Sequence, residues 1–119
     1  MTKAYFRDGE TVEMRVIGHA NFAEQGSDPV CAGASVLAMT AAQSIVCMGE
    51  DGKLEEEPLV HVAGGNVRFR ATPKPEFLAE ARHVLYVAEI GFLLLSEAYP
   101  DHVEFKVETA DADEMESST

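Results

Sequence analysis

The sequence contains few basic residues. Nine lysines and arginines stand against 21 aspartates and glutamates, and the formal net charge is −12. Non-specific binding to DNA or RNA depends mainly on contacts of lysine and arginine with phosphates, so this balance argues against a nucleic-acid partner. If the protein has a charged partner, we expect a basic one.

Cysteine is scarce as well, because only Cys31 and Cys47 are present. If both lie on one helix, a rise of about 1.5 Å per residue separates them by about 24 Å, too far for a disulfide. We therefore expect two reduced thiols. The histidines His61, His83 and His102 show none of the spacings of a zinc site, so the sequence predicts neither a metal nor another cofactor.

The start of the chain lacks the apolar core of a signal peptide. The apolar run from Val84 to Leu95 has twelve residues and is interrupted by Glu89. A membrane span needs roughly 20 apolar residues. We therefore expect a cytoplasmic protein without a membrane partner.

Length and composition indicate one globular domain. The chain of 119 residues is 46% hydrophobic and 25% charged, which is close to the globular average. We assign residues 1–108 to this domain. Residues 109–119 are acidic, serine-rich and without periodicity, and they predict a disordered tail.

Hydrophobic periodicity predicts strands and helices in a simple order. Val12, Met14 and Val16 alternate with polar residues, which is typical of a strand with one wet face, and Gly64-Gly65 predicts a hairpin turn. The predicted strands are residues 3–7, 11–18, 59–63, 66–71 and 101–108, and the predicted helices are residues 29–48 and 75–98. The order ββαββαβ predicts an α+β two-layer fold, in which an antiparallel or mixed sheet of about five strands carries two helices on one face.

The predicted helix at residues 29–48 is small and apolar nearly all round. Such a helix is expected to be buried on most sides, here between the sheet and either the second helix or a partner subunit. Cys47 would then be structural, and Gly49 would end the helix. The acidic run from Glu55 to Glu57 is typical of a solvated loop.

His19 and Cys31 carry the chemistry that the sequence suggests. Asp28 is a strong N-cap residue and Pro29 suits the first helical position, so Cys31 falls at the third. The unpaired amides and the dipole of a helix N-terminus stabilise an anion such as a thiolate, and a neutral imidazole can generate it. The alternative for Cys31 is a small buried packing residue.

The surrounding motif is Gly-His-Ala, a gap of five residues, and Gly-x-Asp-x-Val-Cys-Ala-x-x-Ser. It resembles the signature of the ribosomal-processing cysteine protease family, Prp. The matching residues are Gly18, His19, Ala20, Gly26, Asp28, Val30, Cys31, Ala32 and Ser35. A weaker resemblance runs from Ser96 to Val103, and the match in order and length covers about the first 108 residues.

The resemblance implies a cysteine protease with a Cys-His dyad, in which Cys31 attacks a peptide bond, His19 transfers protons, and amides of the helix N-terminus hold the oxyanion. The implied substrate is a large-subunit ribosomal protein with an apolar, aromatic-containing N-terminal extension. The family also implies a homodimer and a mobile loop that closes over the peptide. The corresponding loop contains the candidate substrate-contact residues Ala20, Phe22 and Gly26.

Asp28 and Ser35 are supporting candidates. Asp28 caps the helix in the simplest interpretation, and in a functional one it also helps to place His19. Ser35 lies one turn beyond Cys31 and faces the same side, where it either contacts the site or packs against a neighbour. Two functions of other classes stay open, namely a redox-sensing thiol at Cys31 and a non-catalytic acidic adaptor of ribosome assembly.

Overall fold

The structure is a computed structural model, and it describes residues 1–19 and 28–109. The elements in chain order are strands β1 (Thr2–Asp8) and β2 (Val12–Ile17), helix α1 (Pro29–Glu50), strands β3 (Leu59–Ala63) and β4 (Asn66–Ala71), the 3-10 turn η1 (Pro75–Phe77), helix α2 (Leu78–Ala98) and strand β5 (Val103–Thr109). The predicted order ββαββαβ is confirmed.

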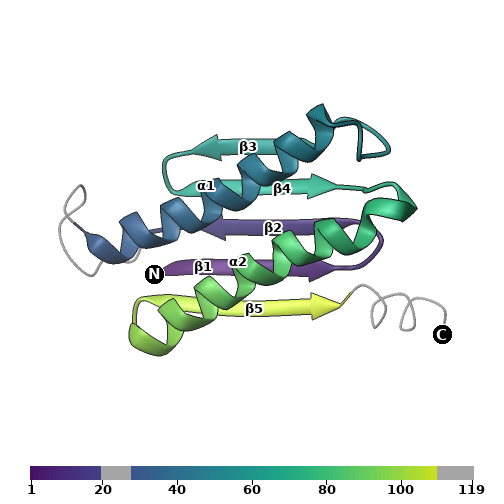
Figure 1. Ribbon diagram of the computed structural model, residues 1–119. Coiled ribbons are helices and arrows are strands. Elements are labelled where there is room, and N and C mark those ends of the chain that lie inside the picture. Colours follow the sequence, from purple (N-terminus) through teal and green to yellow (C-terminus); the bar gives the residue numbers. More distant parts are fainter. Residues whose placement is uncertain (20–27, 110–119) are drawn as a thin grey trace, which may run out of the picture.

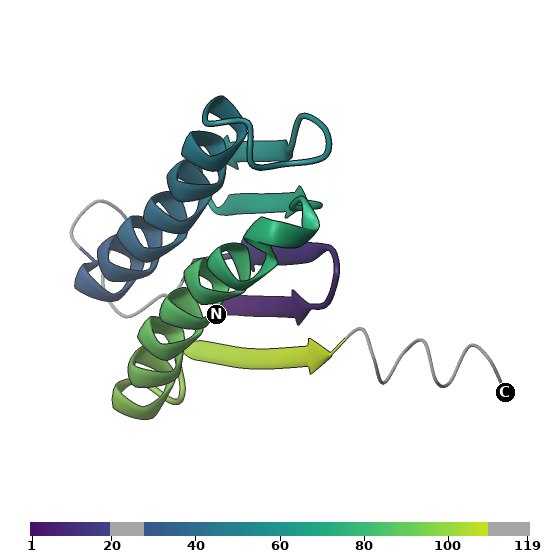
Figure 2. The same ribbon diagram turned by 45° about the vertical axis from the view of Figure 1, so that its right-hand side comes forward.

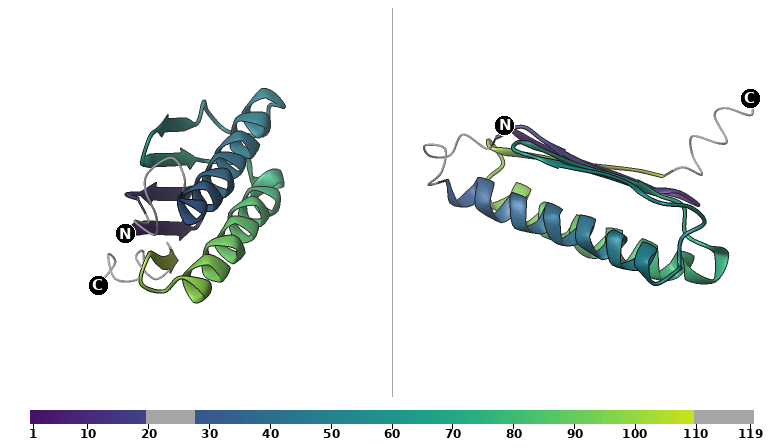
Figure 3. Two further views of the ribbon diagram at one scale, coloured as in Figure 1. Left: turned by 90° about the vertical axis from the view of Figure 1, so that its left-hand side faces the viewer. Right: turned by 90° about the horizontal axis from the view of Figure 1, so that it is seen from above.

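The five strands form one mixed sheet in the order β3-β4-β2-β1-β5. β1 pairs with β5 in parallel, and the other neighbours are antiparallel. Both helices cross the same face of the sheet (Figures 1 and 2), and no described element covers the opposite face (Figure 3). This is the two-layer α+β fold that the sequence predicts.

The core lies between the sheet and the helices. Phe6 of β1 is 2% exposed and Met14 of β2 is fully buried. The Phe6 ring contacts the rings of Phe92 on α2 and Phe105 on β5, and both centroid distances are 5.8 Å. Full burial of a side chain of this size contributes roughly 1.5–3 kcal/mol. These positions therefore decide which face of the sheet receives the helices.

Helix α1 ends later than predicted. It continues past Gly49 through Glu50, and Gly52 adopts the left-handed conformation with φ 73°. The amides of Gly52 and Lys53 donate to the carbonyls of Gly49 and Met48, at 3.1 and 2.9 Å. This is a Schellman end, whose glycine lies one position after the cap, so Gly52 rather than Gly49 ends the helix.

Two other boundaries differ by a few residues. The second predicted helix begins with the 3-10 turn η1, and α2 follows it. β5 includes Thr109, one residue beyond the predicted end of the domain. Residues 110–119, the rest of the predicted tail, lie outside the described residues.

The outer faces of the two helices are apolar and exposed. The protruding large side chains are Val36 on α1 and Tyr86, Val87, Ile90, Leu93 and Leu94 on α2. In the single chain α1 buries only one stripe, which includes Ala34, Ala38 and Ile45. The prediction of a structural Cys47 is wrong, because Cys47 lies off this stripe and is exposed.

By length and composition α1 is also long and apolar enough to cross a membrane. Core helices of water-soluble domains share these features. α1 packs its buried stripe against the sheet in the way that such core helices do.

Glu89 interrupts the apolar run of α2 and is partly buried. This burial and, second, the negative charge of Asp8 raise the pKa of the Glu89 carboxyl above its ordinary value of 4.5. Asp8 itself pairs with Arg82 at 3.0 Å. Because the folded state disfavours the ionised carboxyl, Glu89 lowers stability as the pH rises above its ordinary pKa of 4.5, and this loss is complete above the raised pKa of the folded state.

We expect Glu89→Gln to raise the melting temperature at pH 7 by about 2–4 °C, and to lose this advantage below about pH 4.5, where the carboxyl is protonated in both states. Thermal unfolding followed by circular dichroism over this pH range measures the difference. Glu97→Gln, at an exposed position of the same helix, is the control. A variant no more stable than the native protein at pH 7 would contradict the expected effect of Glu89.

Candidate active site

A cavity of about 430 Å³ opens where the first half of α1 passes the end of β2 and the β3-β4 hairpin. The start of α1, the end of β2 and this hairpin lie at the same end of the sheet (Figure 1). His19, Asp28, Cys31 and Ser35 all line the cavity. The structure thus brings the two predicted catalytic residues and both supporting candidates into one hollow.

Two glycines hold His19 in place. The amide of Gly18, whose φ is 89°, donates to the carbonyl oxygen of Gly65 at 2.9 Å. Gly65 has φ 74°, and a β-carbon there would lie 2.9 Å from Nε2 of His19. The imidazole therefore packs on the backbone of the hairpin turn, in space that a side chain would fill. The predicted turn is confirmed, and its contact with His19 is a role that the sequence did not indicate.

Cys31 is the third residue of α1 and is half-buried. The Asp28 carboxylate, 4% exposed, accepts hydrogen bonds from the amides of Val30 at 2.9 Å and Cys31 at 3.1 Å. Pro29 occupies the first helical position. The predicted N-cap is confirmed, and it fixes the helical turn that carries the thiol.

The same cap changes the expected chemistry of the helix terminus. The amides of Val30 and Cys31 are bound to the Asp28 carboxylate, and the amide of Ala32 donates to the Asp28 carbonyl at 3.0 Å. These three amides are therefore not open to an oxyanion, contrary to the expectation from the sequence. The carboxylate also places a negative charge next to the thiol, which opposes the effect of the helix dipole.

Asn66 is a further residue of this cavity that the sequence did not single out. It lines the cavity, and its Oδ1 atom is buried without a hydrogen-bond partner among the described residues. A side-chain amide offers two donors and an acceptor, which match a peptide group or an oxyanion. The only sequence signal is its position after a glycine turn, where asparagine is common for local reasons.

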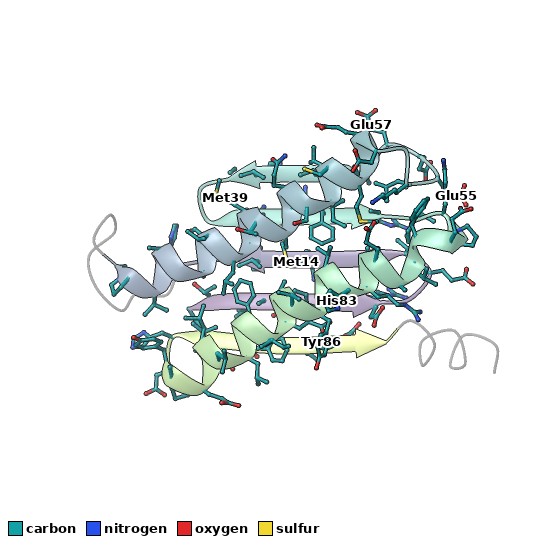
Figure 4. The ribbon with its side chains drawn as sticks, in the orientation of Figure 1. Met14, Met39, Glu55, Glu57, His83 and Tyr86 are labelled. Carbon is teal, nitrogen blue, oxygen red and sulfur yellow. The ribbon has the colours of Figure 1, made fainter. Side chains whose placement is uncertain are left out.

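The cavity has an apolar rim. Met39 on α1 and Val62 on β3 both line it, and each is 51% exposed. Figure 4 shows Met39 on the side of α1 that faces β3. Ser35 is exposed in the same lining, one turn after Cys31. The candidate loop residues Ala20, Phe22 and Gly26 lie outside the described residues.

Other candidates lie away from this cavity. His83 stacks with Tyr86 on α2, with ring centroids 6.5 Å apart. Glu55 and Glu57 are exposed at the opposite end of α1 from Cys31 (Figure 4). Within residues 1–19 and 28–109, no three histidine, cysteine, aspartate or glutamate side chains are grouped so that they could hold a metal ion.

A family model described as cysteine protease Prp matches residues 1–104. The chain belongs to this family. It is therefore a cysteine protease, and the cavity that contains Cys31 is its candidate active site. None of the curated proteins matches the chain.

Solved structures share the fold. An essential ribosomal processing protease Prp from S. aureus, in complex with a covalently linked product peptide, is 22% identical with a TM-score of 0.68, and the match covers 91% of this chain and 100% of that one. The same protease with a substrate peptide is 21% identical with a TM-score of 0.63, at the same coverage. SMU.848 from Streptococcus mutans is 20% identical with a TM-score of 0.65, covering 92% of this chain and 95% of that one.

We expect Gly65→Ala to lower peptidase kcat/KM by about 10- to 100-fold, because a displaced imidazole loses its reactive geometry. The new β-carbon would collide with His19, and alanine is strained at the positive φ of this residue. Gly64→Ala is the matched control, since a β-carbon at Gly64 meets no atom within 4 Å. The rates are measured with a fluorogenic peptide after circular dichroism has shown that both variants fold. Equal rates for the two variants would contradict the role of the Gly65 contact.

Proposed function

We propose that Cys31 is the nucleophile and His19 the general base of this protease. Of the two cysteines, only Cys31 lines the cavity, and Cys47 is exposed elsewhere on α1. Of the four histidines, only His19 lines it. The presence of one thiol and one imidazole in the same hollow is the observation that carries this proposal.

In the proposed reaction His19 takes the proton of the Cys31 thiol, and the thiolate attacks the carbonyl carbon of the scissile bond. The tetrahedral intermediate collapses when His19 gives this proton to the leaving amine, and an acyl group remains on Sγ of Cys31. Water, deprotonated by His19, then attacks the thioester and releases the carboxylic acid. Both side chains return to their starting state, as hydrolysis requires.

The oxyanion of this reaction needs a donor other than the first amides of α1, which Asp28 occupies. We assign this role to the side-chain amide of Asn66. Asn66 lines the same cavity as the thiol, and the NH2 group of its side-chain amide would be the donor. A single side-chain donor to an oxyanion contributes about 2.7–4 kcal/mol to catalysis.

The substrate that we propose is a large-subunit ribosomal protein with an apolar N-terminal extension. The S. aureus relatives are described as ribosomal processing proteases in complex with product and substrate peptides. The exposed side chains of Met39 and Val62 suit an apolar segment, and the net charge of −12 favours a basic partner. Two cysteines without a disulfide agree with action in the reducing cytoplasm.

The test is incubation of the purified protein with a large-subunit ribosomal protein that carries its extension, followed by mass spectrometry. We expect the native protein to remove the extension, and Cys31→Ala to cleave at least about 10³-fold more slowly. His19→Ala loses about 10²- to 10⁴-fold, the usual contribution of a general base. Cys47→Ala is the matched control and keeps the native rate.

Other outcomes would identify the alternative functions. A redox-sensing thiol forms a sulfenic acid at Cys31 with peroxide and leaves the ribosomal protein intact. A non-catalytic adaptor binds the ribosomal protein without cleaving it. Removal of the extension by Cys31→Ala at the native rate would contradict the proposed nucleophile.

We also propose that two copies of the chain pair through the outer helix face. The exposed side chains of α2 include Tyr86 at 56%, Val87 at 54% and Leu94 at 60%. Exposed apolar side chains gathered on one surface mark interaction sites. A two-fold axis brings the same surface of each copy together, so one apolar patch suffices for a closed dimer.

The double variant Val87→Glu/Leu94→Glu places two carboxylates in this face. We expect the native protein to have twice the chain mass of 12.9 kDa in light scattering. The double variant is expected to have the mass of one chain, because buried unpaired carboxylates are strongly disfavoured. Leu59→Glu, at a residue of β3 that is 67% exposed, is the control and stays dimeric. A native protein of single-chain mass at micromolar concentration would contradict the dimer.

A further inference from the structure

The uncovered face of the sheet collects most of the basic residues. Side chains alternate along each strand, and Ala4, Phe6, Met14, Val67 and Phe69 point toward the helices and are buried. The residues between them therefore point to the open side (Figure 3). The basic ones are Lys3, Arg7, Arg15, Arg68, Arg70 and Lys106, six of the nine in the chain. Among the described strand residues, the acidic ones on this side are Glu13, Glu104 and Glu108.

The strand register arranges part of this face as a row without carboxylates. Lys106 of β5 is opposite Tyr5 of β1, Tyr5 is opposite Arg15 of β2, and Arg15 is opposite Arg68 of β4. His61 of β3 follows, opposite Arg68. Neighbouring strands are about 4.8 Å apart, so this row crosses all strands of the sheet. We call these five residues the cationic row.

The next row of the same face is arranged differently. There Arg7 and Arg70 are both opposite Glu13, and Arg70 pairs with it at 3.4 Å. In the cationic row Arg15 and Arg68 face each other directly. Among the described residues, neither arginine has an ion-pair partner. Like charges directly opposite each other destabilise a sheet. A bound anion would remove this repulsion.

The row also offers a planar surface. The guanidinium of Arg15 lies over the Tyr5 ring, 5.4 Å from its centroid. Two shallow hollows of about 480 and 410 Å³ adjoin the row and share Arg15 and Glu13, and Glu108 also lines the first of them. Lys106 and Tyr5 line the first hollow, and Arg68 and His61 line the second. Cations beside an aromatic ring are the combination that binds phosphates and stacks bases.

We propose that the cationic row binds single-stranded RNA, with Lys106, Arg15 and Arg68 on phosphates and Tyr5 beneath a base. The expectation of no nucleic-acid partner rested on the net charge, which averages over the whole molecule. Most acidic residues of the described part of the chain belong to the helices and loops rather than to this face, and charges about 8 Å apart or more are largely screened at physiological salt. The row is on the face of the sheet away from the helices, whereas Cys31 belongs to α1, so we expect RNA binding to be independent of cleavage.

The experiment measures the fluorescence anisotropy of a labelled oligouridylate with the full-length protein at about 50 mM and about 200 mM salt. We expect salt-dependent binding by the native protein. Arg15→Gln/Arg68→Gln is expected to weaken it at least 10-fold, and to lower the salt slope by about 1.4, since each phosphate contact on a single strand contributes about 0.7. Lys53→Gln/Lys74→Gln removes the same charge outside the row and is the control, expected to bind like the native protein. Cys31→Ala is also expected to bind normally.

Four outcomes would overturn the proposal. One is the absence of binding by the native protein at the lower salt concentration, and another is an equal loss in both double variants. A third is equally strong competition by polyglutamate, which carries charge but no bases. The fourth is RNA binding that appears only after Asp111, Asp113, Glu114 and Glu116 are replaced by asparagine or glutamine in the full-length chain. In that case the row would bind this acidic segment of the chain rather than RNA.

Discussion

The hydrogen bonds of Asp28 are the interaction on which the catalytic site depends. One carboxylate accepts the amides of Val30 and Cys31, and the carbonyl of the same residue accepts from Ala32. Such a cap contributes only about 1 kcal/mol to the stability of the folded protein. Its geometric effect is larger, because it fixes where α1 begins and hence where the thiol lies. It also fills the anion site of the helix terminus with a carboxylate of the protein itself, so these amides are not open to an oxyanion.

The second constraint on the structure is the space next to glycine residues, which have no side chain. His19 occupies the volume above Gly65, and the amide of Gly18 is bound to the carbonyl of the same glycine. The helices meet in a similar way, since a β-carbon at Gly91 would lie 2.7 Å from Cδ2 of Leu37. Glycine therefore sets the distance between the imidazole and the hairpin and between α1 and α2.

Local patterns in the sequence predicted much of this structure. Alternation in Val12, Met14 and Val16 predicted a strand with one buried face, and Asp28-Pro29 predicted the start of α1. The resemblance of the motif around His19 and Cys31 to the Prp signature predicted that the two residues belong together, and both line one cavity. These local patterns do not predict contacts between residues that are distant in the sequence. The exposure of Cys47 depends on which side of α1 meets the sheet, and the orphan oxygen of Asn66 depends on how the hairpin packs. Neither is encoded in the neighbouring residues.

The distribution of charge over the surface is another feature that local patterns in the sequence do not predict. A net charge of −12 predicts repulsion of nucleic acid only if the charges are spread evenly. Alternation places Arg15 and Arg68 on the open face, but only the pairing of β2 with β4 puts them opposite each other. The register thus turns scattered arginines into a row, on the side of the sheet away from the Cys31 cavity. A peptide segment in the cavity and an anion on the row would lie at different places on the sheet, so neither would take the space of the other.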